Sequence, residues 1–146
     1  MNHKTRRRFL QFLLGLGFWR PAWGRVQPQP SSKPSTYPAA LAEALNGASW
    51  AESSEILLEI PPQAENGAIV PITVESRLPN TARLFVFAEH NPGPLLARFD
   101  FEPGTEAWVS LRVKLNESGP VLAVAESEGR FYGAVRQVRV MVGGCG

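Results

Sequence analysis

One cysteine carries most of the reactive chemistry that this sequence offers. Cys145 is the only cysteine, and it lies next to the last residue in Gly143-Gly144-Cys145-Gly146. Glycine has no Cβ and visits backbone conformations closed to other residues, so we expect these four residues to form a flexible arm. An extended arm of this length would place the thiol about 10 Å beyond the last ordered strand. The pattern therefore indicates a thiol displayed to other proteins, and the alternative is a frayed chain end with an incidental cysteine.

The rest of the sequence offers little other chemistry. His90 is the only histidine after the first 24 residues, and its neighbours Asn91-Pro92 are typical of a loop residue rather than a catalytic base. Paired cysteines for zinc, a nucleophile elbow, a phosphate loop and a haem attachment pattern are all missing from the sequence. We therefore expect no metal, no cofactor and no catalytic site, and the chain is a poor candidate for an enzyme.

Residues 1–24 have the three zones of an export signal. Lys4 to Arg8 form a basic region, Phe9 to Trp19 an apolar region, and Ala22-Trp23-Gly24 offers small residues for cleavage. The apolar run is shorter than the about 20 residues that a membrane-spanning helix needs. We therefore predict an exported protein without a membrane anchor.

The basic region resembles a twin-arginine export signal, with Arg6 and Arg7 as the paired arginines of Thr5-Arg6-Arg7-Arg8-Phe9-Leu10-Gln11. The alternative is an ordinary secretory signal that happens to contain three arginines. The resemblance implies a periplasmic protein that crosses the inner membrane already folded. In that oxidising compartment a lone thiol either pairs with another chain or is kept as a reactive group.

The positive charge of the chain belongs largely to this leader. Residues 1–24 contain five basic residues and no acid, whereas the residues from Arg25 onward carry ten basic and thirteen acidic side chains, a formal charge of −3. A nucleic-acid-binding domain would need a basic face. We therefore expect no nucleic-acid partner.

Residues 25–37 are rich in proline and read as an extended linker, followed by one domain over residues 38–146. Pro38 to Asn46 favour a short helix, because Pro38 suits a first turn and Gly47 can end it. Leu41 and Leu45 would give this helix one apolar stripe.

From Ile56 onward, apolar residues recur with period two between turn residues. This pattern predicts an all-β fold, an immunoglobulin-like antiparallel β-sandwich of about seven strands. Pro71 lies within one run and predicts an edge strand or a bulge there, because proline cannot donate a ladder hydrogen bond. The predicted strands are Ile56–Ile60, Val70–Glu75, Arg83–Glu89, Leu95–Phe101, Glu106–Leu115, Val121–Glu126 and Phe131–Val142.

One predicted strand, Arg83–Glu89, is apolar on both faces. Leu84 and Val86 lie on one face, and Phe85 and Phe87 lie on the other. One face must enter the core between the sheets, so the aromatic face needs a cover from a strand, the helix or another protein.

Together these features resemble the SoxY family, the sulfur-carrier subunits of the periplasmic Sox system that oxidises thiosulfate. The similarity runs from about Leu41 to the end of the chain. In the family the cysteine is usually followed by two glycines, whereas Gly146 follows it alone here. A terminal carboxylate closer to the thiol would slightly favour its neutral form, so the enzymes that receive the arm would supply the activating charge. The match rests on the leader, Pro61-Pro62-Gln63-Ala64-Glu65-Asn66-Gly67, Val70-Pro71, Asn91-Pro92 and Val142-Gly143-Gly144-Cys145-Gly146.

The resemblance implies a covalent sulfur carrier that attaches its substrate to Cys145 through the glycine arm. It also implies a heterodimer with a SoxZ-like β-sandwich subunit, which could cover the aromatic face at Phe85 and Phe87. The other implied partners are a haem c-containing enzyme that couples thiosulfate to the thiol, a hydrolase that releases sulfate, and in some systems a sulfane dehydrogenase. Two alternatives stay open: a similar carrier in another sulfur pathway, and an exported β-sandwich binding module whose cysteine makes only an intermolecular disulfide.

Overall fold

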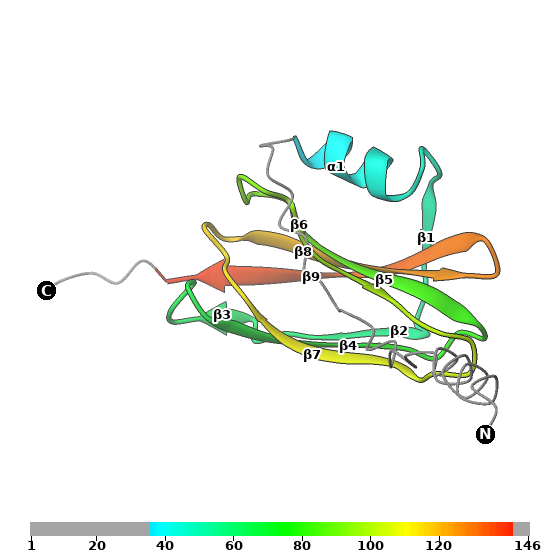
Figure 1. Cartoon of the computed structure of the whole chain (residues 1–146). Coiled ribbons are helices and arrows are strands. Elements are labelled where there is room, and N and C mark those ends of the chain that lie inside the picture. The colour runs from blue at the N-terminus through cyan, green and yellow to red at the C-terminus, as the bar shows by residue number, and fades with distance from the viewer. Residues whose placement is uncertain (1–35, 142–146) are drawn as a thin grey trace, which may run out of the picture.

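Two β-sheets packed face to face form the body of the protein, and one helix lies over the outer face of the larger sheet (Figure 1). The computed structural model describes residues 36–141. The predicted leader, nearly all of the predicted linker and the last five residues therefore lie outside the described residues. In chain order the elements are α1 (Tyr37–Ala44), β1 (Trp50–Glu52), β2 (Ile56–Glu59), β3 (Gln63–Ala64), β4 (Val70–Ser76), β5 (Thr81–Ala88), β6 (Leu95–Asp100), β7 (Ala107–Val113), β8 (Gly119–Ser127) and β9 (Arg130–Val140).

The larger sheet has the strand order β1-β9-β8-β5-β6, with β3 also paired to β9, and the smaller sheet has the order β2-β4-β7. The long neighbours β5, β6, β8 and β9 pair antiparallel, as do all strands of the smaller sheet. Each of the seven predicted strands is present, with ends shifted by at most two residues. The predicted β-sandwich is confirmed.

Two short strands that the sequence did not predict add to the larger sheet. Both β1 and β3 pair parallel to β9, with Trp50 opposite Phe131 and Gln63 opposite Arg139. They contain three and two residues, too few to show a period of two in the sequence. As a result the side of β9 away from β8 is bordered by β1 near its start and by β3 at its end.

The core between the sheets is made by the alternating residues that face inward. Val70, Ile72 and Val74 of β4 are at most 1% exposed, and they face Leu84 and Val86 of β5, which are fully buried. Branched aliphatic side chains suit these positions, because they pack well on a pleated surface.

The aromatic face of β5 forms a second core beneath helix α1. Phe85 and Phe87 have no exposed surface, and Leu45 just after the helix is equally buried against them. The ring of Tyr37 meets Phe87 edge-on at a centroid distance of 6.3 Å. The suggestion that a partner subunit covers this face is therefore wrong, because the chain covers the face with its own helix.

Helix α1 spans Tyr37–Ala44, whereas the sequence predicted residues 38–46. The chain leaves the helix through two positive φ angles, 53° at Asn46 and 76° at Gly47. The amide of Gly47 donates to the carbonyl oxygen of Ala42 at 2.7 Å, which satisfies a carbonyl at the helix end. Burial, followed by the nearby carboxylate of Glu89, raises the pKa of the Tyr37 phenol.

Pro71 lies in β4, which is the middle strand of the smaller sheet rather than an edge strand. The pairing with β2 ends at Thr73 opposite Glu59, so at Pro71 strand β4 pairs only with β7. The prediction of an edge strand was wrong for β4 as a whole, although Pro71 itself lies where β4 has only one neighbour.

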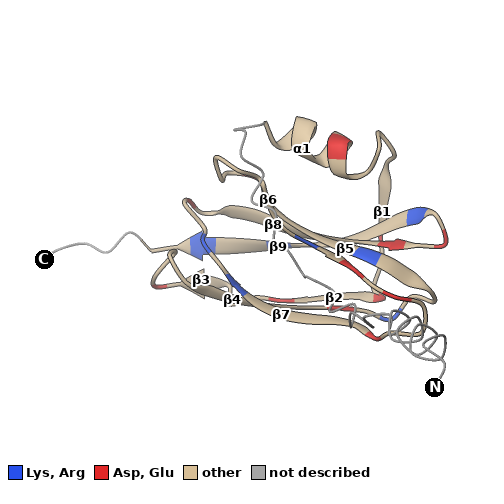
Figure 2. Cartoon of the chain, viewed as in Figure 1, with Lys and Arg blue, Asp and Glu red and all other residues tan. Residues whose placement is uncertain are grey.

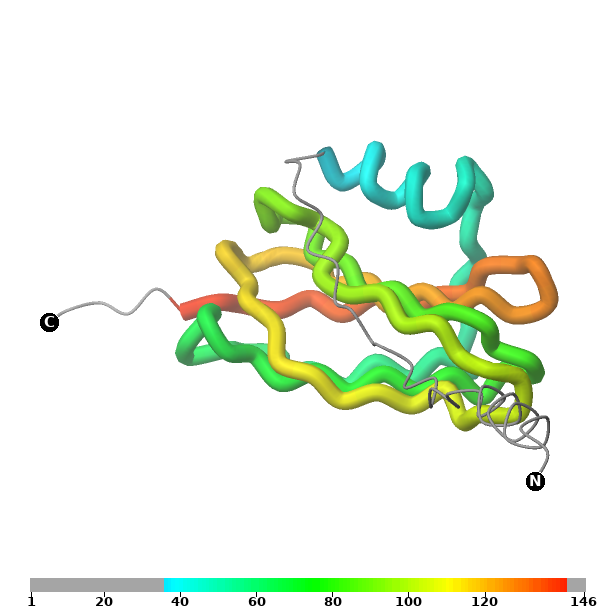
Figure 3. The backbone as a smooth tube through the Cα atoms, in the orientation of Figure 1, coloured from blue at the N-terminus to red at the C-terminus, as the bar shows by residue number. Residues whose placement is uncertain are grey.

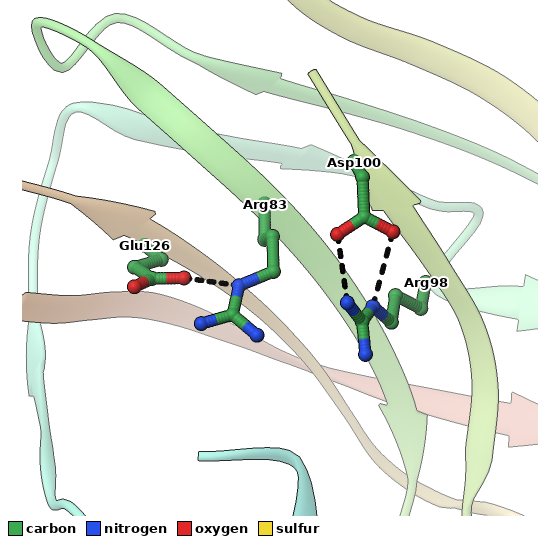
Figure 4. A network of polar contacts seen from close by, with 4 residues as sticks. All are labelled: Arg83, Arg98, Asp100 and Glu126. Carbon is green, nitrogen blue, oxygen red and sulfur yellow. Dashed lines mark hydrogen bonds and ion pairs between the residues drawn. The ribbon is translucent and has the colours of Figure 1, made fainter. Parts of the chain in front are cut away.

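Beyond the helix, the outer face of the larger sheet carries two ion pairs, Arg83–Glu126 and Arg98–Asp100 (Figure 4). Arg83 pairs with Glu126 across β5 and β8, and this hydrogen bond raises the pKa of the arginine. Arg98 holds Asp100 with two hydrogen bonds of 2.8 and 3.1 Å. The guanidinium carbons of Arg83 and Arg98 lie 5.8 and 5.9 Å from the centroid of the Phe85 ring. Cation–π attraction therefore links these two ion pairs to the second core.

Basic and acidic residues are mixed along the strands of both sheets (Figure 2). None of the helices within residues 36–141 has the length and apolar character needed to span a membrane.

Candidate functional site

The residues predicted to carry the chemistry, Cys145 with Gly143, Gly144 and Gly146, lie outside the described residues. The same is true of Arg6 and Arg7 in the predicted export signal. The described chain ends at Met141, one residue after β9. The described residues nearest to this site are the end of β9, Arg139 to Met141, together with the segments bonded to it. We call this the arm base.

On one side, the arm base is bonded to residues 61–67, which we call the strap. Strand β3 within the strap pairs with β9 in parallel. The amide of Arg139 donates to the carbonyl oxygen of Pro62, and the amide of Met141 donates to that of Ala64, both at 2.9 Å. The backbone is thus hydrogen-bonded up to the last described residue.

Gly67 closes the strap against β9 and the segment after β7. The amide of Leu115 donates to the carbonyl oxygen of Gly67 at 2.7 Å. A Cβ atom at Gly67 would lie 2.4 Å from the carbonyl oxygen of Leu115 and 2.8 Å from Cγ1 of Val140. Only glycine allows this approach, which gives a physical reason for the end of the Pro61–Gly67 motif.

On the other side, the arm base is bonded to Ser118. The pairing of β8 with β9 ends at Gly119 opposite Val138, and the side chain of Ser118 continues it. The amide of Val140 donates to Oγ of Ser118 at 2.8 Å, and this hydroxyl in turn donates to the carbonyl oxygen of Val140 at 3.3 Å. The backbone of Val140 is therefore held by a side chain in place of a strand.

His90 and Asn91 hold the loop that carries Ser118. His90 donates from Nδ1 to the carbonyl oxygen of Ser118 at 2.7 Å, which requires the proton on that nitrogen. Asn91 donates from its amide to the carbonyl oxygen of Lys114 at 2.7 Å and accepts from the amide of Asn116 at 2.9 Å. These contacts assign His90 and Asn91 a structural role in supporting the arm base.

Segments that are far apart in the sequence therefore meet at one end of the sandwich. The loops that follow β3, β5 and β7 gather where β9 ends (Figure 3). The Pro61–Gly67 and Asn91-Pro92 motifs, noted in the sequence only as resemblances, both act on this end. Ser118 was missed, because Asn116 to Pro120 reads as an ordinary turn and no sequence signal marks the serine.

The surroundings of the arm base are open to solvent on one side. A shallow groove of about 530 Å³ lies beside it, and its lining includes Gln63, Gln137 and Arg139. Among residues 36–141, no three histidine, cysteine, aspartate or glutamate side chains are grouped to hold a metal ion. The described residues of the arm base therefore fix the position and direction from which the chain continues toward Cys145.

Comparisons with known proteins give the family context. The model of the family described as sulfur oxidation protein SoxY matches residues 41–145. The structure of the sulfur carrier protein SoxY from Chlorobium limicola f thiosulfatophilum is similar with a TM-score of 0.66 and 33% identity, over 75% of this chain and all of that one. No curated protein sequence is significantly similar to the chain.

The sandwich also resembles that of a superoxide reductase (neelaredoxin) from Ignicoccus hospitalis. The TM-score is 0.50 at 23% identity, and the match covers 73% of this chain and 94% of that one. At this identity the likeness concerns the fold alone.

Proposed function

The chain belongs to the SoxY family of sulfur oxidation proteins, and we propose that it is a sulfur carrier whose cargo is bound covalently to Cys145. The family match extends through Cys145, so it includes the cysteine as well as the sandwich. On this proposal the chain is a substrate carrier and not itself an enzyme.

The proposed cycle begins with an oxidation at the thiol. The Cys145 sulfur forms a bond to the outer sulfur of thiosulfate, the thiol proton is lost, and two electrons pass to a haem c-containing partner. The product is a cysteine S-thiosulfonate. Water then cleaves the bond between the sulfone and the neighbouring sulfur, which releases sulfate and leaves a persulfide on Cys145. In systems with a sulfane dehydrogenase, that enzyme would accept the electrons as the outer persulfide sulfur is oxidised to a sulfonate with oxygen atoms from water. A second hydrolysis would then release sulfate and return the thiol.

The observation that carries this proposal is the construction of the arm base. Hydrogen bonds hold the backbone at Val140 and Met141 from both sides, whereas the next residues include Gly143 and Gly144, which lack side chains. A fixed base followed by a slender chain suits a thiol that must enter the narrow active sites of several enzymes. Such an arrangement would be of little use to a thiol that forms one static disulfide.

We propose that the carrier works in the periplasm after export by the twin-arginine route through Arg6 and Arg7. We also propose that it pairs with a SoxZ-like β-sandwich subunit and presents its cargo to the thiosulfate-coupling and sulfate-releasing enzymes. Since α1 covers Phe85 and Phe87, that subunit must bind elsewhere on the surface.

Intact-mass analysis after incubation with thiosulfate and the purified partner enzymes tests the proposal. We expect an added mass of a thiosulfonate or a persulfide in the parent chain and none in Cys145→Ser. A reducible dimer as the only product, together with full thiosulfate turnover by Cys145→Ser, would contradict it.

A second set of variants tests the role of the arm. Replacing Gly143 and Gly144 with valine should sharply lower turnover and leave the melting temperature unchanged. Gly93→Ala is the matched control, because a Cβ there would meet no atom within 4 Å. Unchanged turnover in the valine variant would show that a slender chain is not required.

A further inference from the structure

The smaller sheet leaves one long strand with an unpaired side. Strand β7 is the last strand in the order β2-β4-β7, and within residues 36–141 nothing pairs with its outer edge. It has seven residues and no proline. A regular edge strand of this kind presents a row of free backbone donors and acceptors to another chain.

Several apolar side chains of β7 are also more exposed than they would be beside a further strand. Trp108 is 54% exposed, one of three large apolar residues in the described chain with such exposure. Val109 and Leu111 belong to the inward-facing set but are only half-buried, because no strand lies beyond them. Both faces of β7 would therefore lose apolar exposure if another strand were added.

We propose that β7 pairs antiparallel with β7 of a second copy of this chain, with Ser110 opposite Ser110 of that copy. The two smaller sheets would join into one six-stranded sheet across a two-fold axis. This inference concerns the sandwich alone and does not depend on the chemistry of Cys145.

The residue pattern of β7 is complementary to itself in this register. On the outer face, Trp108 lies opposite Arg112 of the copy, a pair suited to cation–π attraction. The residues that flank the strand, Glu106 and Lys114 of the copy, would form a pair of opposite charge. Because of the two-fold symmetry, each of these pairs occurs twice in the dimer. These four side chains are exposed and therefore available for such pairing.

On the inner face, the same register places Val109 opposite Leu111 of the copy. Both residues would gain an apolar neighbour in place of water. The same pairing thus buries apolar surface below the sheet and matches charges above it.

Neighbouring registers lack this match. With Val109 opposite itself, Glu106 would meet Arg112, but Trp108 would face Ser110. With Leu111 opposite itself, Trp108 would meet Lys114, but Glu106 would face Asn116. Only the register centred on Ser110 gives both outer pairs, and this self-complementarity favours a second copy over an unrelated partner.

The proposed pairing has a consequence for the arm base. Leu115, just beyond β7, is bonded to Gly67 of the strap, so the C-terminal end of β7 and the end of β9 lie at the same end of the sandwich (Figure 1). Antiparallel pairing of β7 would place the two arm bases at opposite ends of the dimer. Each arm would then remain accessible to partner enzymes.

Sedimentation analysis over a range of concentrations tests the pairing, using the chain from residue 25 onward with Cys145→Ser to prevent disulfide dimers. We expect a reversible dimer. Glu106→Lys should weaken it about tenfold, because each of the two ion pairs becomes a repulsion. Lys114→Glu should do the same, and the double variant should restore the parent affinity. Glu59→Lys, an exposed charge on the opposite edge strand β2, is the matched control and should change nothing.

A cysteine placed at the two-fold axis gives a second measurement. Ser110→Cys in the same background should form a disulfide dimer on mild oxidation, because facing residues of antiparallel strands lie within disulfide range. Glu59→Cys should not. A parent chain that stays monomeric at every concentration, or a double variant no tighter than the single ones, would overturn the proposal. The proposal would also be overturned if the edge of β7 became protected only after a different β-sandwich subunit was added.

Discussion

Gly67 determines how closely the strap approaches the arm base. A Cβ atom at this position would lie nearest to a backbone oxygen, that of Leu115, which cannot rotate away. Relief would require moving either the strap or the end of β9. A residue without reactive chemistry is thus important because it fixes where the predicted carrier arm begins.

We expect Gly67→Ala to lower the free energy of unfolding by about 2 kcal/mol, in the range of overpacking substitutions. Gly93→Ala, the matched control, should stay within about 0.5 kcal/mol of the parent. Chemical denaturation of both variants measures the difference. Equal stability of the two variants would show that a Cβ atom at residue 67 fits without displacing the backbone of Leu115.

Strand β9 is the element that connects the sandwich to the predicted arm. At its end the neighbouring strand β8 has already stopped, and a serine hydroxyl takes over the hydrogen bonding of Val140. Asn91 keeps the loop of that serine in place through Lys114 and Asn116. The end of β9 is therefore held by side chains as well as by the short strand β3.

Ser118→Ala should release the end of β9 without unfolding the sandwich. The loss of two hydrogen bonds to Val140 is expected to destabilise this end by about 1 kcal/mol, so the Val140 amide should exchange with solvent about fivefold faster. Hydrogen exchange followed by NMR measures this rate. Ser54→Ala, an exposed serine far from β9 in the sequence, serves as the control. If the Val140 amide were equally protected in both variants, β3 alone would be sufficient to hold the strand.

At the scale of the whole molecule, the larger sheet is buried over its inner face and, around Phe85 and Phe87, over part of its outer face. Its inner face packs on the smaller sheet, and its outer face packs on α1 and Leu45. A short helix alone is marginal in water, so α1 depends on this packing for its stability. The helix and the aromatic face of β5 therefore stabilise each other.

Leu45→Ala tests this dependence. A fully buried leucine replaced by alanine loses about 2–5 kcal/mol, whereas Leu41→Ala, at a half-buried position, should lose clearly less. Thermal denaturation compares the two variants. Similar losses of stability at both positions would mean that Leu45 contributes no more to the second core than Leu41 does.

Removing the helix altogether gives a complementary prediction. A chain that begins at residue 48 would expose Phe85 and Phe87 over one face of the larger sheet, so it should bind a hydrophobic dye and aggregate. The matched comparison is a chain that begins at residue 36 and keeps α1. If the shorter chain stayed soluble without binding the dye, the helix would not be the necessary cover of that face.

The sequence alone was enough for features that depend on near neighbours. Period-two runs such as Val70, Ile72 and Val74 predicted strands, because one face of each must be buried, and turn residues such as Asn46-Gly47 marked the limits of elements. The family could also be identified from short motifs. The role of Cys145 and its glycines remains a prediction from sequence and family, because these residues lie outside the described part of the chain.

Only the tertiary structure decided which distant segments meet. It showed that α1 covers Phe85 and Phe87, that residues 61–67 border the end of β9, and that Ser118 holds Val140. None of these pairings leaves a periodic signal, because each joins residues separated by more than twenty positions. Local patterning determines which face of an element is apolar, whereas the closing of long loops around a shared core determines what that face will contact.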